Sequence, residues 1–560
     1  MILAGYARED DEPRLNEYGN STKSNVNCEE GYSAERREIM TTFYARHNNL
    51  SAVRYWFTYE LASPEHSTER VTPSTVREVT KACFRSDKNT DWFREFVKKM
   101  MLEEVSKPVW DAILHWSVLY DGHGPDEIKA MIEKKSIEVD VATLNSLIEA
   151  AIDKNDPYMA ERFFSYGFAM GLKPNAETLI LQMNYRLAAN DLSGADGIYE
   201  HLVHGEIEVP GDEDLPVINK YVRALCDAAN PKIDRILQIV GHLENRNSVM
   251  FPETLAAFCL VMLKADRQID VINMLSIHAQ YHSLEQRETI HQALVAYCLD
   301  VNNSTARAWD SYSLLRQFFP ETKRHLRHQI MQSFFQRKRP DMAVHVFGHM
   351  RGHTDESMHP DSKLYVACLE GLGQFSDGEG VRLVHNMLKM DTRVPMDTKM
   401  YNALMIAYMG CEQYRKTMEF WREITILPEG PSLQSLEIVL TACEYMPFGD
   451  KWARVIWRRV ERMDIDVPPQ VYTAYLGALA SGGFLEEVKR AIQGMNAAMS
   501  YAPQIATFAV VFNALTPSKQ KTFEKWAIKE FPEIWARVAS LGRKVTQGRL
   551  QIKYNRRLEA

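Results

Sequence analysis

Residues 141–175 read VATLNSLIEAAIDKNDPYMAERFFSYGFAMGLKPN, and this stretch decides the fold. Apolar residues recur at helical spacing from Thr143 to Ile152 and again from Tyr158 to Met170, with a short polar turn between them. A Gly-Leu-Lys-Pro exit follows, and the next unit of the same kind begins at Ala176. A single helical hairpin cannot bury its apolar face, so this unit predicts stacked neighbours and an all-α solenoid.

The same unit recurs along the chain at a period close to 35 residues. Its anchor is a small or branched residue in the second helix, followed by aromatic or aliphatic residues. Over the last five copies the anchor steps by 38, 36, 36 and 35 residues. Because several apolar positions hold one register over hundreds of residues, the pattern indicates a repeat array. The anchor residues are Ala160, Ala195, Ala343, Val381, Thr417, Ala453 and Val488.

Three segments resemble the pentatricopeptide repeat family: TLNSLIEAAI (143–152), MYNALMIAYM (400–409) and the GLKPN exit (171–175). Tetratricopeptide repeats have a similar hairpin, but their Trp-Leu-Gly-Tyr pattern is not found in the first helices. The resemblance implies an all-α fold, a right-handed superhelical solenoid of about a dozen helical hairpins.

We divide the chain by repeat quality and by two acidic stretches that contain Pro and Gly, at 205–215 and 352–361, where we expect bends. The expected parts are a disordered acidic N-terminal segment (1–30), N-terminal helical repeats (31–205), central degenerate repeats (206–351), C-terminal pentatricopeptide-like repeats (352–541) and a basic C-terminal tail (542–560).

Composition narrows the class of protein. Strand signals are poor, and no apolar run is long enough to span a bilayer, so no integral membrane segment is expected. Eight cysteines form no CxxC pair, and five of them recur inside first helices, which predicts buried core thiols. The acidic run at 9–12 argues against a mitochondrial presequence in this chain.

Nothing in the sequence indicates an enzyme. Phosphate-loop, HExxH and GxSxG motifs are absent, and no cofactor is expected. His345, His349 and His353 recur one helical turn apart, but a metal site needs further ligands and supporting hydrogen bonds. We therefore expect neither a catalytic nor a metal site.

The family resemblance implies single-stranded RNA as a partner, with one base per repeat read by the fifth residue of the first helix and the last residue of the repeat. Asn145 with Asn175, and Asn402 with Ser432, match that pattern. The alternative is that Asn145 and Asn402 are polar residues near a helix start that bond local backbone. At the fifth position other repeats carry Ile180, Val366 and Thr473, of which only the threonine could bond a base.

The net charge of the chain also bears on whether it binds RNA. The 66 basic and 74 acidic residues give a net charge of −8, whereas a protein that follows a phosphate backbone needs a positive groove. Basic segments exist at 323–328, 336–340 and 454–462. They are interpreted either as solvated faces balanced by nearby acids or as parts of an RNA track.

Degenerate repeats, the acidic balance and the segment VWDAILHWSVLYDG (109–122) resemble those family members that assist the assembly of respiratory complex I. That resemblance implies a mitochondrial chaperone, in the matrix or on the matrix side of the inner membrane, whose partners are protein subunits of a membrane-arm intermediate of NADH:ubiquinone oxidoreductase. The alternative is a single-stranded RNA-binding protein that acts in mitochondrial RNA stability, processing or translation.

Overall fold

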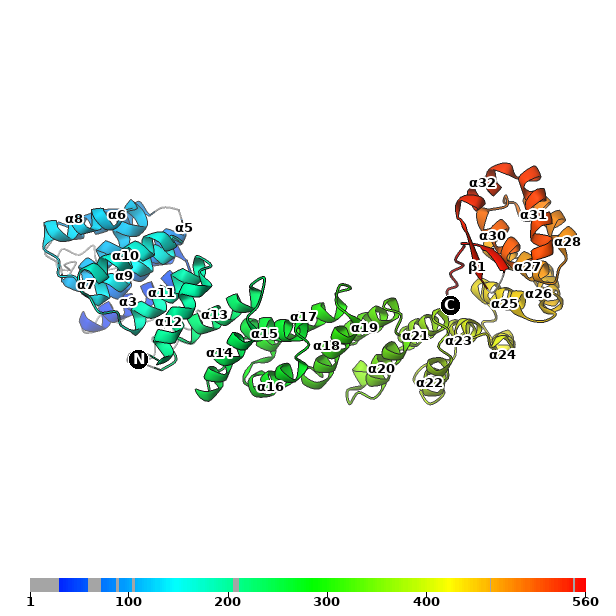
Figure 1. The fold of residues 1–560 in the computed structure, drawn as a ribbon, viewed down its shortest axis with the longest axis horizontal. Coiled ribbons are helices and arrows are strands. Elements are labelled where there is room, and N and C mark those ends of the chain that lie inside the picture. Colours follow the sequence, from blue (N-terminus) through cyan, green and yellow to red (C-terminus); the bar gives the residue numbers. More distant parts are fainter. Residues whose placement is uncertain are drawn as a thin grey trace. The chain divides into compact units, whose positions relative to one another are not determined.

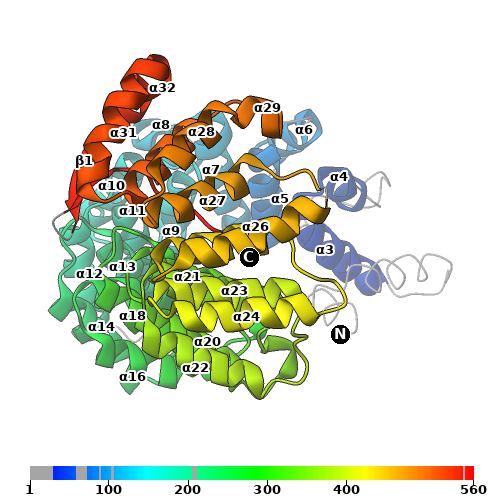
Figure 2. The ribbon, with the colours of Figure 1, turned by 90° about the vertical axis from the view of Figure 1, so that its right-hand side faces the viewer.

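The computed structural model describes residues 30–58, 72–86, 90–102, 106–204, 211–463, 465–546 and 549–560. The chain divides into two compact units, Met1–Val261 and Met262–Ala560. Each unit consists of helical hairpins that follow one another along the chain (Figures 1 and 2). The acidic segment expected at 1–30 and most of the bend expected at 205–215 lie outside the described residues.

The described part of unit 1 contains six consecutive hairpins, and the boundary with unit 2 falls within the next helix. Its elements are α3 (Glu30–Arg46), α4 (Leu50–Thr58), α5 (Pro73–Ser86), α6 (Asp91–Met100), α7 (Lys107–Trp116), η3 (Ser117–Asp121), α8 (Pro125–Lys135), α9 (Val141–Asp153), α10 (Pro157–Ala169), α11 (Ala176–Ala188), α12 (Leu192–His204), α13 (Leu215–Asp227), α14 (Ile233–Asn245) and α15 (Pro252–Lys264).

Unit 2 continues the same alternation and ends in a short β-hairpin. Its elements are α16 (Gln268–His278), η4 (Ala279–Tyr281), α17 (Leu284–Leu299), α18 (Thr305–Phe318), α19 (Arg324–Gln336), α20 (Pro340–Arg351), η5 (Glu356–Met358), α21 (Ser362–Gln374), α22 (Gly378–Lys389), α23 (Thr398–Gly410), α24 (Tyr414–Ile426), α25 (Leu433–Tyr445), α26 (Gly449–Met463), α27 (Pro469–Ser481), α28 (Leu485–Gln493), α29 (Met495–Met499), α30 (Ile505–Ala514), α31 (Pro517–Glu530), α32 (Pro532–Ser540), β1 (Arg543–Thr546) and β2 (Arg549–Ile552).

In most hairpins the first helix packs on the second, and within each unit first helices pack on first helices. Figure 2 shows α23 and α24 lying side by side as one such hairpin. In unit 1 the row of first helices runs α3, α5, α7, α9, α11 and α13, and in unit 2 it runs α17, α19, α21, α23, α25, α27 and α30. The all-α repeat solenoid predicted from the sequence is confirmed.

The predicted register is visible in the burial of side chains. All seven anchor residues of the second helices have 0% exposure, because each packs into the layer between two hairpins. The five cysteines that recur in first helices are also buried, as predicted. They are Cys226, Cys259, Cys298, Cys368 and Cys443. Burial raises the pKa of these thiols, which fits small apolar core residues rather than reactive groups.

The β-hairpin lies where the sequence predicted only a basic tail. Arg543 to Thr546 pairs antiparallel with Arg549 to Ile552. Asn513 of α30 holds the second strand with two hydrogen bonds: its Nδ2 donates to the Ile552 carbonyl (3.1 Å), and its Oδ1 accepts from the Ile552 N–H (2.7 Å). Ile552 is 1% exposed. A short pair of strands is marginal alone, and here the helices stabilise it.

Two glycines allow α21 and α23 to approach closely. A Cβ atom on Gly410 would lie 1.9 Å from the carbonyl oxygen of Gly373, and one on Gly373 would lie 2.8 Å from the carbonyl oxygen of Ile406. Both obstacles are backbone atoms, which cannot rotate away. The spacing of these two first helices therefore requires glycine.

We expect Gly410→Ala to separate α21 from α23 and to lower the free energy of unfolding by at least about 1–3 kcal/mol, the usual cost of overpacking. Gly348→Ala in α20 is the matched control, because its Cβ would meet only Met387 Cε, at 3.8 Å. The control should gain about 0.5–1 kcal/mol from the better helix former. Urea midpoints of the full chain, followed by circular dichroism, compare the two. Equal midpoints would contradict the close-packing argument.

A buried histidine links two first helices of unit 1. His115 of α7 has 0% exposure, and its Nδ1 lies 2.9 Å from the carbonyl oxygen of Ser146 in α9. Burial lowers the pKa of His115 to about 4, despite the opposing charge of Glu149. Lys81 and Arg77 lower this pKa further. The neutral imidazole is therefore the form that the fold accommodates.

Because the unfolded chain binds a proton at His115 near pH 6.5 and the folded chain only near pH 4, this residue makes stability fall as the pH decreases between those values. We expect His115→Asn, whose amide can still donate to Ser146, to flatten the decrease in melting temperature between pH 6.5 and pH 4. Thermal melts at several pH values check this. An unchanged slope would show that His115 is not a source of acid sensitivity.

Candidate binding surface

A polar link recurs between neighbouring first helices. The hydroxyl of Thr178, the third residue of α11, donates to Asn145 Oδ1, the fifth residue of α9, at 2.7 Å. In unit 2 the hydroxyl of Ser435 in α25 donates to Asn402 Oδ1 in α23, also at 2.7 Å. We call this contact the fifth-to-third link. The same positions are joined in Asp111 with Thr143 (2.7 Å) and Thr473 with Thr507 (3.0 Å).

Three of the four links are also tied to the side-chain cap of the second helix, and the exception is α30, whose N-cap residue Gln504 forms no side-chain cap hydrogen bond. Asn175 caps α11 by accepting the N–H of Thr178 (2.9 Å), and Ser432 caps α25 by accepting the N–H of Ser435 (3.2 Å). Polar side chains at this position bond the free N–H groups that every helix start exposes. The link therefore joins helix capping to the placement of the preceding repeat.

The structure brings both predicted RNA-reading pairs together. Asn145 Nδ2 lies 3.2 Å from Asn175 Oδ1, and Asn402 Nδ2 lies 3.3 Å from Ser432 Oγ. Asn145 and Asn402 are only 3% and 2% exposed, and Asn145 Nδ2 also donates to Glu177 (2.7 Å). Their amides are thus engaged inside the protein.

The alternative expectation, that these asparagines bond local backbone, was wrong about the partner. Both side chains bond side chains of the next repeat, some 30 residues further along the chain. The position of each asparagine near a helix start points only to partners in its own helix, and the observed partners lie outside that helix. The signal was present, since Thr178 and Ser435 stand three residues after a capping residue in each case.

The fifth residue is not polar in every repeat. Val366 of α21 is buried, and Ile180 of α11 is half-buried. Asp111, by contrast, is a buried carboxylate whose pKa is raised by burial, against the opposing hydroxyl of Thr143. A base-reading surface would need an exposed polar group at these positions, and the described repeats of this face do not supply one regularly.

Residues 553–560 lie along the first helices of unit 2. The guanidinium of Arg556 donates to the hydroxyl of Thr441 in α25 (2.8 Å) and lies 3.2 Å from Glu444 of the same helix. The N–H of Ala560 donates to Glu370 of α21 (2.7 Å). Figure 1 shows the chain running from β1 to its C-terminal end beside α21 and α23. The basic tail predicted at 542–560 is thus a β-hairpin followed by a docked extended segment.

The face under this segment is acidic. Glu370, Glu437 and Glu444 all project from first helices, and Glu437 is the fifth residue of α25. Burial raises the pKa of Glu437 and of Glu444, while Arg556 acts to lower both. Like charges and desolvation disfavour ionised carboxylates unless a cation is nearby. Arg556 supplies that cation.

Several arginines of the basic segments form hydrogen bonds or ion pairs within the protein. Arg327 donates to the carbonyl oxygens of Thr322 (2.9 Å) and Pro320 (2.8 Å), and Arg337 donates to carbonyl oxygens at the end of α17, including that of Asp300 (2.5 Å). In 454–462, Arg454 forms a two-bond pair with Glu487 of α28.

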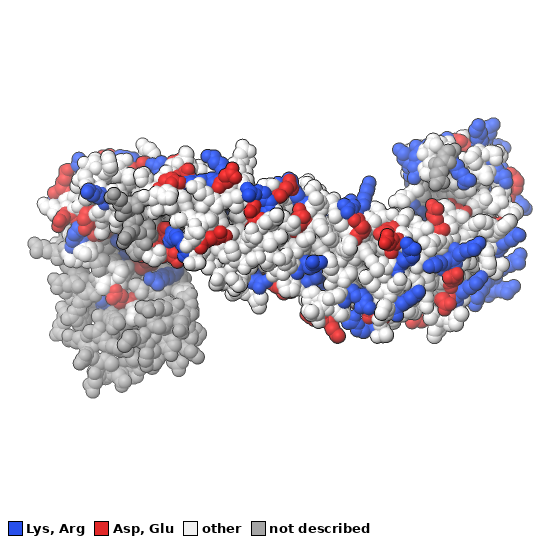
Figure 3. Space-filling view, turned by 60° about the horizontal axis from the view of Figure 1, so that its bottom comes forward, with Lys and Arg blue, Asp and Glu red and all other residues white. Residues whose placement is uncertain are grey.

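Exposed cations remain on α26, at Arg458, Arg459 and Arg462. Figure 3 shows Lys and Arg gathered at the end of the visible face where the C-terminal repeats lie. Because α26 is a second helix, these arginines belong to a different helix row from the fifth-to-third links.

The histidines at 345, 349 and 353 contact protein groups. His349 Nδ1 lies 2.9 Å from the Tyr312 hydroxyl, and His353 Nε2 lies 3.1 Å from the Pro320 carbonyl oxygen. No group of three or more potential metal ligands occurs among the described residues. Within the same ranges, no helix combines the length and the apolar character that a membrane span requires.

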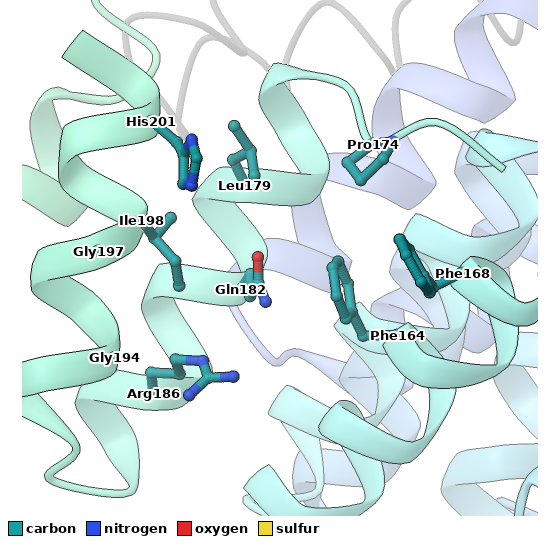
Figure 4. A pocket seen from close by; sticks show the side chains of 10 residues that line it. All are labelled: Phe164, Phe168, Pro174, Leu179, Gln182, Arg186, Gly194, Gly197, Ile198 and His201. Carbon is teal, nitrogen blue, oxygen red and sulfur yellow. The ribbon is translucent and has the colours of Figure 1, made fainter. Parts of the chain in front are cut away.

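Unit 1 has an apolar groove between α10 and α12, of about 720 Å³. Figure 4 shows Phe164 and Phe168 of α10 on one side and Ile198 of α12 on the other, with Leu179 and Gln182 of α11 between them. Gly194 and Gly197 of α12 also line the groove. Phe168 is 72% exposed.

No protein-family model matches the chain. The chain is 39% identical over 568 residues to "Complex I intermediate-associated protein 84, mitochondrial" of Neurospora crassa, an alignment that covers 98% of this chain. The chain spans 66% of the length of that relative.

Among solved structures, it is similar to the pentatricopeptide repeat protein PPR10 in complex with an 18-nt psaJ RNA element, with a TM-score of 0.38, 13% identity, and coverage of 94% of this chain and 73% of that one. Yeast Rmd9p in complex with a 16-nt target RNA gives a TM-score of 0.32 and 10% identity, with coverage of 90% and 96%.

The stacked hairpins and their register define a helical-repeat protein, an all-α solenoid. In sequence, the chain is similar over nearly its whole length to complex I intermediate-associated protein 84, of which it spans 66%.

If the link is structural, Asn402→Ala should lower the free energy of unfolding by about 1–3 kcal/mol, because the hydroxyl of Ser435 loses a buried acceptor. Asn402→Asp should cost less, since it keeps that acceptor, as Asp111 does for Thr143. Gln434→Ala, at an exposed neighbouring position, is the control. Urea midpoints rank the three variants. If the urea midpoint of Asn402→Ala equals that of the control, Asn402 does not stabilise the stack of repeats.

Proposed function

We propose that this chain is a non-enzymatic helical-repeat scaffold that assists the assembly of respiratory complex I in mitochondria. It would hold protein subunits of a membrane-arm intermediate, in the matrix or on the matrix side of the inner membrane. The scaffold covers an exposed subunit surface until the next subunit arrives. The observation that carries this proposal is the 39% identity, over 98% of the chain, to a mitochondrial complex I intermediate-associated protein.

The state of the fifth positions supports a protein partner over RNA. Asn145 and Asn402 are buried and already bond the next repeat, so a base would have to break protein hydrogen bonds to be read. Leaving such buried groups unpaired costs about 1–3 kcal/mol each. Sequence-specific reading of the kind that Asn145/Asn175 and Asn402/Ser432 would provide is therefore disfavoured.

The charge of the first-helix face supports the same choice. Glu370, Glu437 and Glu444 stand on this face of unit 2. Phosphate groups that follow the face would meet these carboxylates, and like charges brought together cost several kcal/mol. A peptide segment with a basic residue meets no such penalty.

The second candidate, an RNA-binding protein of mitochondrial transcripts, is favoured by one observation. The exposed arginines of α26 and the gathering of cations in Figure 3 offer an electrostatic surface for a phosphate backbone. Such a surface would bind RNA without reading its sequence.

The test is affinity purification of the tagged full chain from mitochondria of its own host, with half of the lysate treated with nuclease. We expect membrane-arm subunits of complex I to remain bound after the treatment. Arg458→Glu combined with Arg462→Glu on α26 is the matched variant, and it should capture the same subunits. Loss of partners with nuclease or in this variant, together with RNA whose binding falls steeply with salt, would establish the second candidate instead.

A further inference from the structure

The segment that follows the β-hairpin has the side-chain pattern of a bound extended peptide. Ile552, Tyr554, Arg556, Leu558 and Ala560 are buried or half-buried, while the residues between them are exposed. A period of two is the pattern of an extended chain with one side against a surface. Tyr554, Leu558 and Ala560 pack against the apolar core of unit 2.

Residues 555–560 are held by side chains rather than by a sheet. Lys553 still extends the strand pairing, because its N–H donates to the Gly542 carbonyl (3.0 Å), and the Tyr554 N–H donates to the Ile552 carbonyl (2.8 Å). Beyond them, residues 555–560 form no backbone-to-backbone hydrogen bond with any described residue. The polar contacts are those of Arg556 with Thr441 and Glu444, and of the Ala560 N–H with Glu370. A segment attached in this way can leave without breaking a strand ladder or a helix.

The surface under this segment carries a buried carboxylate, Glu444, which is stabilised by a cation from the segment. The side chain of Glu444 is only 6% exposed, and its contact with Arg556 is its one ion pair among the described residues. Gly477 of α27 leaves room beside it, because a Cβ there would lie 2.7 Å from Glu444 Oε2. A buried carboxylate without a cation is costly, so an empty face would select for a segment that carries an arginine.

We propose that the first-helix face of α21 to α25 is a docking groove for an extended segment of a partner protein, and that residues 553–560 occupy it as an internal ligand until that segment replaces them. The partner segment alternates an aromatic residue, an arginine and a leucine with exposed residues. The inference rests on the proposed function, since it names how the scaffold recognises a subunit.

An internal ligand lowers the apparent affinity of any external one. A tethered segment acts at an effective concentration of about millimolar, so a free peptide competes poorly until the tether is released. Weakening the segment without changing the groove should therefore expose the site.

The experiment uses the full chain and a fluorescein-labelled peptide, KYNRRLEA, which copies residues 553–560. The released variant carries Arg556→Ala and Leu558→Ala and keeps the β-hairpin. We expect the peptide to bind it at least about tenfold more tightly than it binds the unaltered chain, by fluorescence anisotropy. Arg557→Ala is the matched control, because that side chain is 87% exposed and its one ion pair among the described residues is with Glu559. The control should bind like the unaltered chain.

Two further measurements identify the groove. Adding Glu444→Gln to the released variant should weaken the peptide about tenfold, while a peptide in which the residue matching Arg556 is alanine should bind both forms equally weakly. Absence of peptide binding to a released variant with an unchanged circular dichroism spectrum would overturn the inference. So would tighter binding of a polyuridine oligonucleotide than of the peptide.

The outcome is separable from that of the proposed function. Subunits of complex I that co-purify with the chain while the peptide fails to bind would refute only the groove. A peptide that binds while no subunit co-purifies would leave the groove in place and refute the assembly proposal.

Discussion

The fifth-to-third link is the constraint on which the repeat stack depends. Both of its side chains are buried, and each would cost about 1–3 kcal/mol if left unpaired. The third residue belongs to the first turn of its helix, next to the cap, so the same contact fixes where one helix begins and where the previous helix lies. A slip of one residue between neighbouring repeats would break the link, while the cap, which joins residues three apart, would remain. In α11 and α25 capping and inter-repeat register therefore share one residue, Thr178 or Ser435.

This requirement has a consequence for recognition. In the family scheme, the fifth and last residues of a repeat read a base. Here Asn145 and Asn402 use their amides to join repeats, while Val366 and Ile180 stand at the same position with no polar group. Between α21 and α23, where the fifth residue is Val366 and the link is absent, the close contact of Gly373 with Gly410 sets the spacing of the two helices. The face thus gains its order from contacts within the protein, and selectivity has to come from its shape and charge.

The repeat array could be predicted from the sequence because its signal is local. The anchor residues recur at a fixed spacing and all prove fully buried, and a helical hairpin needs only neighbours in the chain to form. The links were not predicted, because each partner lies about 33 residues away and the local signal, a Thr or Ser three residues after a capping residue, does not identify the residue that it bonds. The β-hairpin was missed for a related reason: its four-residue strands are mostly exposed and basic, and helix side chains hold them in place.

The two buried carboxylates of the first-helix row show how far a repeat stack can satisfy its own polar groups. Asp111 has a donor from the next repeat, Thr143, and a cation in its own helix, Lys107. Glu444 has neither from a neighbouring first helix; its cation, Arg556, belongs to a segment that also bonds Thr441, 115 residues away in sequence. Contacts in a repeat array are made between neighbouring repeats. A cation supplied from so far along the chain is therefore not one of the contacts that the repeats themselves make. It belongs instead to the chemistry of an open face that binds an extended chain, for which the protein's own last described residues are one occupant.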